Sequence, residues 1–219
     1  MLWDAITGKE QLLLQKETHE VTSCAISADG RTIVSLSFGG VLLRMWKTIL
    51  GKKRLFWWVP LGLSFYPPFH ACTISANGHL VVACRFDKIY MWKIGLLWRH
   101  RTLHGHEKKI TSCAISADGH TIVSASDDRT LKVWDTTSGK DRLTLSGHTS
   151  QVKGCALSPD GCFIISIASN TFKVWNAVSG ICLLTIPVDK TLYGCIFHSS
   201  GKHFVVYGEQ GVFLFQLVL

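Results

Sequence analysis

The residues best suited to chemistry lie between positions 100 and 128. Three histidines, His100, His104 and His106, come close together, and the acidic pair Asp127-Asp128 follows them. Histidines four residues apart on a helix can ligate zinc, and a histidine beside a carboxylate can act in acid–base catalysis. No cysteine or carboxylate completes the zinc set, and no serine or cysteine nucleophile motif accompanies the acidic pair. We therefore predict no metal, no cofactor and no enzymatic activity.

The chain contains eight cysteines, which in a small secreted protein would indicate a disulfide framework. Five of them instead share one position of an internal repeat: Cys24, Cys72, Cys113, Cys155 and Cys195. A thiol at a repeated position is expected to pack inside its own unit as a small apolar group. Cys84, Cys162 and Cys182 form no C-x-x-C pair, and no basic and apolar leader follows Met1. We therefore expect reduced cysteines and a cytoplasmic protein.

The internal repeat is marked by the motif C-x-I-S-A-D-G, which occurs without change at residues 24–30 and 113–119. Near copies begin at the other three repeat cysteines, so the intervals are 48, 41, 42 and 40 residues. An aromatic residue follows each copy at a similar distance: Trp46, Trp92, Trp134, Trp175 and Phe215. Two markers with the same period of about 40 residues predict a repeat architecture.

Residues 105–139 form the most complete repeat, GHEKKITSCAISADGHTIVSASDDRTLKVWDTTSG. Apolar and polar residues alternate through 112–115, 121–125, 130–134 and 142–145, which is typical of strands. Asp118-Gly119 provides a tight turn between the first two. The odd spacing of Ile110 and Cys113, two positions expected to be buried, predicts a β-bulge, and two other repeats share it. Because no stretch has a helical period, we predict an all-β chain of four-stranded antiparallel units.

Four motifs of this repeat resemble a blade of the WD-repeat β-propeller family: Gly105-His106, residues 116–119, residues 124–128 and Trp134-Asp135. The resemblance implies a β-propeller with a hydrogen-bonded network inside the blade, formed here by His106, by Ser124 or Ser126, and by Asp128 and Trp134. Such a network is needed because a buried indole N–H or imidazole is costly without a partner. Only this repeat has the full set. The fourth repeat has His148 and Trp175, and the others lack the histidine.

We interpret residues 1–219 as one propeller domain with blades at about 20–59, 70–102, 108–146, 151–186 and 191–219. Residues 1–9 repeat the end of a third strand. The resemblance implies that residues 10–15 complete the last blade as its outer strand and close five blades into a ring. The alternative is a partial ring that self-associates. The apolar residues 55–69 are too short to span a bilayer, and they are either an outer strand with a proline-rich corner or a partner-binding patch.

The resemblance implies a non-catalytic protein–protein interaction scaffold, or a sensor module like the WD repeats of large signalling ATPases. By the same analogy, the candidate protein-binding residues are Lys108, Lys109, Asp127, Gln151 and Lys190. The alternative function is binding to nucleic acid or another anionic surface, because the net charge is +8. Basic clusters occur in predicted loops at Lys52-Lys53-Arg54, at residues 99–101 and at Lys108-Lys109.

Overall fold

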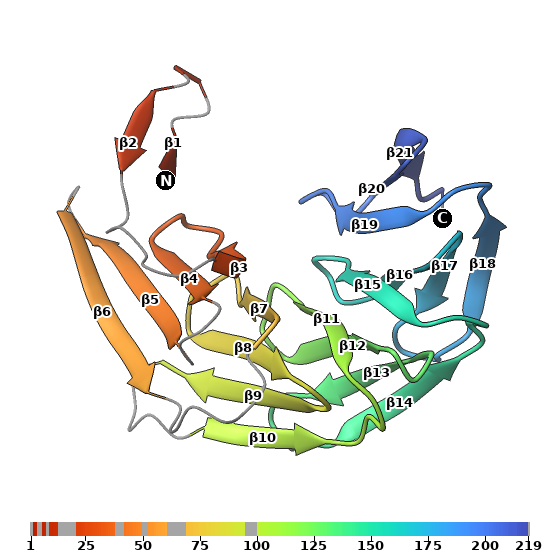
Figure 1. Ribbon diagram of the computed structural model, residues 1–219, viewed down its shortest axis with the longest axis horizontal. Helices are drawn as coiled ribbons and strands as arrows, with labels where there is room; N and C mark the ends of the chain where they lie inside the picture. The colour runs from red at the N-terminus through yellow and green to blue at the C-terminus, as the bar shows by residue number, and fades with distance from the viewer. Residues whose placement is uncertain are drawn as a thin grey trace.

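The computed structural model describes residues 2–3, 6–7, 9–12, 21–37, 42–49, 52–60, 69–94 and 100–218. Within these residues the chain is all-β, and five antiparallel sheets follow one another around an arc (Figure 1). The first strand of each sheet lies on the inside of the arc and the last strand on the outside. This is the arrangement of propeller blades, and we number the sheets as blades 1 to 5 along the chain.

Blades 1 to 4 have four strands each and blade 5 has three. Blade 1 contains β3 (Val21–Ile26), β4 (Thr32–Ser37), β5 (Leu42–Ile49) and β6 (Lys52–Pro60). Blade 2 contains β7 (Ala71–Ile74), β8 (Leu80–Arg85), β9 (Lys88–Lys93) and β10 (His100–His104). Blade 3 contains β11 (Ile110–Ile115), β12 (Thr121–Ser126), β13 (Thr130–Asp135) and β14 (Asp141–Ser146). Blade 4 contains β15 (Val152–Leu157), β16 (Phe163–Ala168), β17 (Thr171–Asn176) and β18 (Cys182–Pro187), and blade 5 contains β19 (Leu192–Phe197), β20 (His203–Gly208) and β21 (Gly211–Gln216).

The expected closing strand does not join blade 5. β2 (Glu10–Leu12) pairs with β1 (Leu2–Trp3), and β21 is the last strand of its sheet. A local hairpin brings together strands that are close in sequence, whereas pairing with β21 would close a loop of almost the whole chain at a higher entropic cost. Figure 1 accordingly shows an open arc with the two chain ends on opposite sides of the opening.

The repeated S-A-D-G motif is explained by the turn that it builds between the first and second strands. In blade 3, Ser116 Oγ donates to Asp118 Oδ1 and accepts from the backbone N–H of Thr121 at 3.0 Å. Ser27, Ser75 and Ser158 make the same two bonds in their own blades. Gly119 adopts a φ of 75°, which an L side chain rarely does. The motif therefore specifies a turn rather than a site.

The predicted bulges are confirmed in the first strands. The register shifts by one residue between Ile110 and Ser112 in blade 3, and blades 1, 4 and 5 have the same shift. The bulge allows Ile110 and Cys113, which are an odd number of residues apart, to point toward the same side of the sheet.

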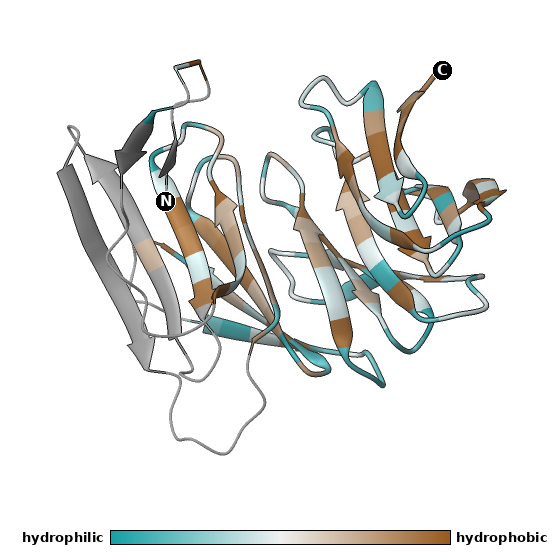
Figure 2. Ribbon diagram, turned by 45° about the horizontal axis from the view of Figure 1, so that its top comes forward, coloured by the Kyte–Doolittle hydropathy of each residue, from teal (hydrophilic) through white to brown (hydrophobic). Residues whose placement is uncertain are grey.

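The core lies between consecutive blades rather than inside any one of them. One cluster joins Val123 and Val133 of blade 3 to Val152, Ile164 and Trp175 of blade 4, and three similar clusters join the other neighbouring pairs. Hydrophobic residues accordingly make up much of the strands in the coloured part of Figure 2. In the described part of the chain, no helix is long and apolar enough to cross a membrane.

The repeat cysteines follow this packing with one exception. Cys72 and Cys155 are buried, Cys113 and Cys195 are partly buried, and all eight cysteines are unpaired. Cys24 is exposed, so its predicted burial is wrong. Among the described residues, no sheet packs on the face of blade 1 on which Cys24 lies.

Candidate functional site

A chain of hydrogen bonds at the centre of blade 3 joins three of the side chains singled out by the sequence. His106 Nε2 lies 2.8 Å from Ser124 Oγ, and Trp134 Nε1 donates to the same oxygen at 2.9 Å. All three residues are buried. Ser124, rather than Ser126, is therefore the serine that links the imidazole to the indole.

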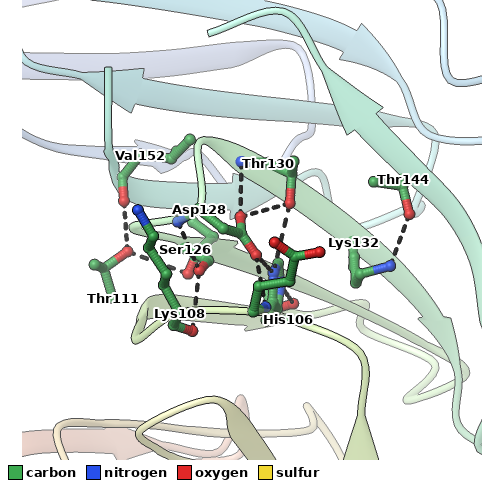
Figure 3. Close-up of polar contacts among 12 residues, drawn as sticks. His106, Lys108, Thr111, Ser126, Asp128, Thr130, Lys132, Thr144 and Val152 are labelled. Atoms are coloured by element: carbon green, nitrogen blue, oxygen red, sulfur yellow. Dashed lines mark hydrogen bonds and ion pairs between the residues drawn. The ribbon is translucent and has the colours of Figure 1, made fainter. Parts of the chain in front are cut away.

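Asp128 binds the other side of the imidazole (Figure 3). Its Oδ2 lies 2.7 Å from His106 Nδ1, and its Oδ1 accepts from both the backbone N–H and the hydroxyl of Thr130 at 2.9 and 2.6 Å. Burial raises the pKa of the Asp128 carboxyl, but the hydrogen bonds from Thr130 and His106 outweigh it and lower the pKa to about 2. Asp128 is therefore an anion at neutral pH.

The protonation of His106 follows from its partners. The carboxylate can only accept, so Nδ1–H donates to Asp128. Burial lowers the pKa of His106, and the Asp128 hydrogen bond only partly opposes this effect. In the neutral tautomer Nε2 accepts the Ser124 hydroxyl proton, and Ser124 Oγ accepts the indole N–H of Trp134. Each buried polar atom of His106, Ser124 and Trp134 then has a hydrogen-bond partner, as expected of a structural network.

The same carboxylate holds the loop that precedes β11. Asp128 Oδ2 also accepts the backbone N–H of Glu107 at 3.2 Å. Ser126 Oγ donates to the carbonyl of Lys108 at 3.2 Å, and the backbone N–H of Asp127 donates to the carbonyl of Lys109 at 2.9 Å. Residues 107–109 of the loop are thus bound to residues 126–128, at the end of β12 and the start of the following turn, through three consecutive residues on each side.

The predicted binding residues lie on loops at this end of the blades. Lys108 and Lys109 are exposed, and their backbone carbonyls accept hydrogen bonds from Ser126 and Asp127. Asp127 and Gln151 are brought together by Lys153, whose Nζ lies 2.8 Å from Gln151 Oε1 and 3.5 Å from Asp127 Oδ1. This contact bridges blades 3 and 4. Lys190 is exposed on the loop before β19, and no contact among the described residues joins it to the others.

Sequence reasoning missed Lys153. It is the extra residue of the β15 bulge, between Val152 and Gly154. The residue at the equivalent position in blade 3 is Thr111, whose hydroxyl donates to the carbonyl of Val152 at 2.6 Å. The bulge was predicted, so asking where its extra side chain points could have identified both contacts.

The basic clusters are placed differently from the prediction. Lys52-Lys53-Arg54 lies in β6 and not in a loop, and Arg101 lies in β10, where it donates to the carbonyl of Thr137 at 2.7 Å. Arg99 lies outside the described residues. Lys52-Lys53-Arg54 and His100-Arg101 lie in outer strands because the ladders with β5 and β9 extend as far as these residues. Of the three predicted loop clusters, Lys108-Lys109 lies in a loop.

The described residues do not form the zinc site that the histidines could have suggested. His100 and His104 are in a strand rather than on a helix, and no group of three His, Cys, Asp or Glu side chains could hold a metal ion among the described residues. Burial raises the pKa of the Cys72 and Cys155 thiols to about 12, so these thiols are protonated and poorly nucleophilic.

The family model described as WD domain, G-beta repeat (WD40) matches residues 98–135 and 139–176. These two stretches of the chain are WD40 repeats. The matches end at Trp134-Asp135 and at Trp175-Asn176, and each contains one hydrogen-bonded set of a histidine, a serine and a tryptophan. The family accounts for the fold and for the network, and WD40 repeats generally serve as protein–protein interaction scaffolds. No curated protein matched the chain.

Proposed function

We propose that this WD-repeat chain is a non-catalytic scaffold that binds another protein at the end of blades 3 and 4 carrying the loop at residues 105–109. The observation that carries the proposal is the set of three bonds that hold this loop to residues 126–128. A loop already held in one conformation loses little entropy when it binds, so its exposed side chains are effective contacts. Lys108 and Lys109 are these side chains.

The charges at this end favour a protein over a nucleic acid. The exposed Glu107 adjoins the two lysines, and Asp127 is next to Lys153 at 3.5 Å. A nucleic-acid groove would instead need a continuous basic surface with aromatic residues for stacking. Mixed charges give a partner specificity through complementary pairs.

The test compares two double variants that remove the same charge from opposite ends of the blades. Lys108→Ala/Lys109→Ala alters the candidate surface, and Lys140→Ala/Lys202→Ala alters exposed lysines at the other end. Immobilised wild-type and variant proteins are used to retain binding proteins from a nuclease-treated extract, with quantification by mass spectrometry. We expect the first variant to lose a saturable protein partner that the second retains.

Equal loss in both variants would contradict the proposed surface, because it would indicate binding through net charge. The alternative function is tested with a fluorescent 20-mer of single-stranded DNA. Binding with a steep dependence on salt, about one power of concentration per contacted phosphate, would favour nucleic acid.

A further inference from the structure

Each blade has one face toward the preceding blade and one toward the following blade, and the core clusters show which residues belong to each. Blade 3 uses Ile110 and Ile122 against blade 2, and Leu131 and Val133 against blade 4. We call the first the N-side face and the second the C-side face. The two end blades each have one face without a neighbouring blade within the described chain.

The C-side face of blade 5 is apolar and exposed. Val212 and Leu214 of β21 are 73% and 70% exposed. Their positions in the register of the sheet are those of Leu131 and Val133 in blade 3, which are both 0% exposed. Tyr207, Tyr193 and Ile196 extend the surface and are 43%, 60% and 60% exposed. We call these five residues of blade 5 the C-side patch.

Within the C-side patch, Tyr207 lies close to a glycine of the neighbouring strand. The Tyr207 side chain lies across Gly194, where a Cβ atom would stand 2.2 Å from the tyrosine oxygen. A glycine at this position therefore lets the aromatic ring lie flat against the sheet. The two tyrosines of the patch offer a large contact area to a partner, because aromatic side chains bury much surface on binding.

The N-side face of blade 1 is the opposite half of the same kind of interface. Val21 and Ile26 are 45% and 51% exposed, whereas Val152 and Leu157, at the same repeat positions of blade 4, are 0% and 8% exposed. Cys24 is exposed between them. We call Val21, Cys24 and Ile26 the N-side patch.

The chemistry of the patches defines what can cover them. None of the eight residues is charged, although the chain has a net charge of +8. An acidic protein or a nucleic acid would therefore find its complement elsewhere on the molecule. Within the chain, a C-side face is covered by the N-side face of the next blade at each of the four junctions between neighbouring blades. The molecule thus carries both halves of an interface that it already forms internally.

We infer that the C-side patch of one copy binds the N-side patch of a second copy, in a head-to-tail contact. Such a contact is heterologous, because different surfaces meet, so each copy keeps one unused patch for a further copy. Burial of apolar side chains drives it, and it should be insensitive to salt.

The first experiment measures mass by light scattering over a range of concentrations, using nuclease-treated protein. Wild type should show a mass that rises with concentration and is unchanged between 0.1 and 0.5 M salt. Val212→Asp and Ile26→Asp should each be monomeric when alone. Val178→Asp and Ile181→Asp are the matched controls, because these apolar residues are 74% and 61% exposed but lie on neither patch; they should associate as wild type does. Wild type that stays monomeric would overturn the inference.

The decisive experiment mixes the two patch variants. Val212→Asp keeps its N-side patch and Ile26→Asp keeps its C-side patch, so a one-to-one mixture should form a dimer that neither variant forms alone. If the mixture stays monomeric, or if Ile26→Asp alone still associates, the contact is not head-to-tail. Thermal unfolding of each variant verifies folding, and Val212→Ser and Ile26→Ser replace any variant whose melting temperature falls.

Discussion

Blades 3 and 4 contain nearly the same polar centre, but only blade 3 has a carboxylate in it. In both, one serine oxygen joins a histidine and a tryptophan, at 2.8 and 2.9 Å in blade 3 and at 2.7 and 2.8 Å in blade 4. A lysine lies over each indole, 5.9 Å from the Trp134 ring centre and 5.8 Å from that of Trp175. The positions of the histidine and the tryptophan therefore do not depend on the carboxylate.

The difference between the blades arises from the length of one turn. β12 and β13 are joined by three residues, the second of which is Asp128, whereas β16 and β17 are joined by Ser169-Asn170 alone. Within the described chain His148 Nδ1 has no hydrogen-bond partner, and no hydrogen bond joins the loop at residues 147–151 to its turn. The comparison teaches that Asp128 fixes a surface loop rather than the blade's core.

The largest effect should come from the serine that both blades share. Ser124→Ala leaves the Trp134 indole N–H and the His106 imidazole, both buried, without their common partner. We expect the free energy of unfolding to fall by about 2–4 kcal/mol. Ser166→Ala should cost a similar amount, as measured by urea denaturation. A much smaller loss in one blade would show that the two centres are not equivalent.

The histidines should separate the blades. His106→Ala removes one hydrogen-bond partner from Asp128 and one from Ser124 and should cost about 1–3 kcal/mol, whereas His148→Ala removes a single bond, to Ser166, and should cost about 1 kcal/mol. Thermal or urea unfolding of the two variants tests this difference. Equal costs would mean that Asp128 contributes nothing to the blade through His106.

The pH dependence should be stronger for His148 than for His106. Burial, and then the charge of Lys173, lower the pKa of His148 from 6.5 to about 4. Between these values the unfolded chain binds a proton that the folded chain does not, so the free energy of unfolding decreases as the pH falls from 6.5 to 4. His148→Asn should flatten this dependence more than His106→Asn does, because Asp128 partly opposes the shift in His106. An unchanged slope in His148→Asn would contradict the burial of a neutral imidazole.

The smallest effect on stability should come from the exposed lysines. Lys108 and Lys109 are bound to Ser126 and Asp127 through their backbone carbonyls, so Lys108→Ala/Lys109→Ala leaves these hydrogen bonds in place. The free energy of unfolding should change by less than about 0.5 kcal/mol. A larger loss in urea denaturation would mean that these side chains are structural, and a binding defect in this variant would then lose its meaning.

The sequence predicted the features that repeat and missed those that depend on neighbours. The period of Cys113 and Trp134 gave the blades, and the S-A-D-G motif and the bulge spacing gave correct local geometry. The prediction that β2 completes blade 5 was wrong. Whether β2 pairs with β1 or with β21 depends on the entropic cost of loop closure, which no local sequence pattern encodes. The Lys153 bridge depends on contacts between blades, and the exposure of Cys24 and Val212 depends on where the arc ends. The position of a residue within its repeat therefore predicts neither the Lys153 bridge nor these exposures.

The most direct test of the account is the amide hydrogen exchange of Glu107 and Thr149, the residues that follow the two histidines. Glu107 N–H donates to Asp128, whereas Thr149 N–H has no such partner in the described structure. Glu107 should exchange more slowly than Thr149 in the wild type, and Asp128→Ala should bring the two rates together without changing Thr149. If Glu107 stays protected in Asp128→Ala, the carboxylate does not fix the loop, and the proposed binding surface loses its physical basis.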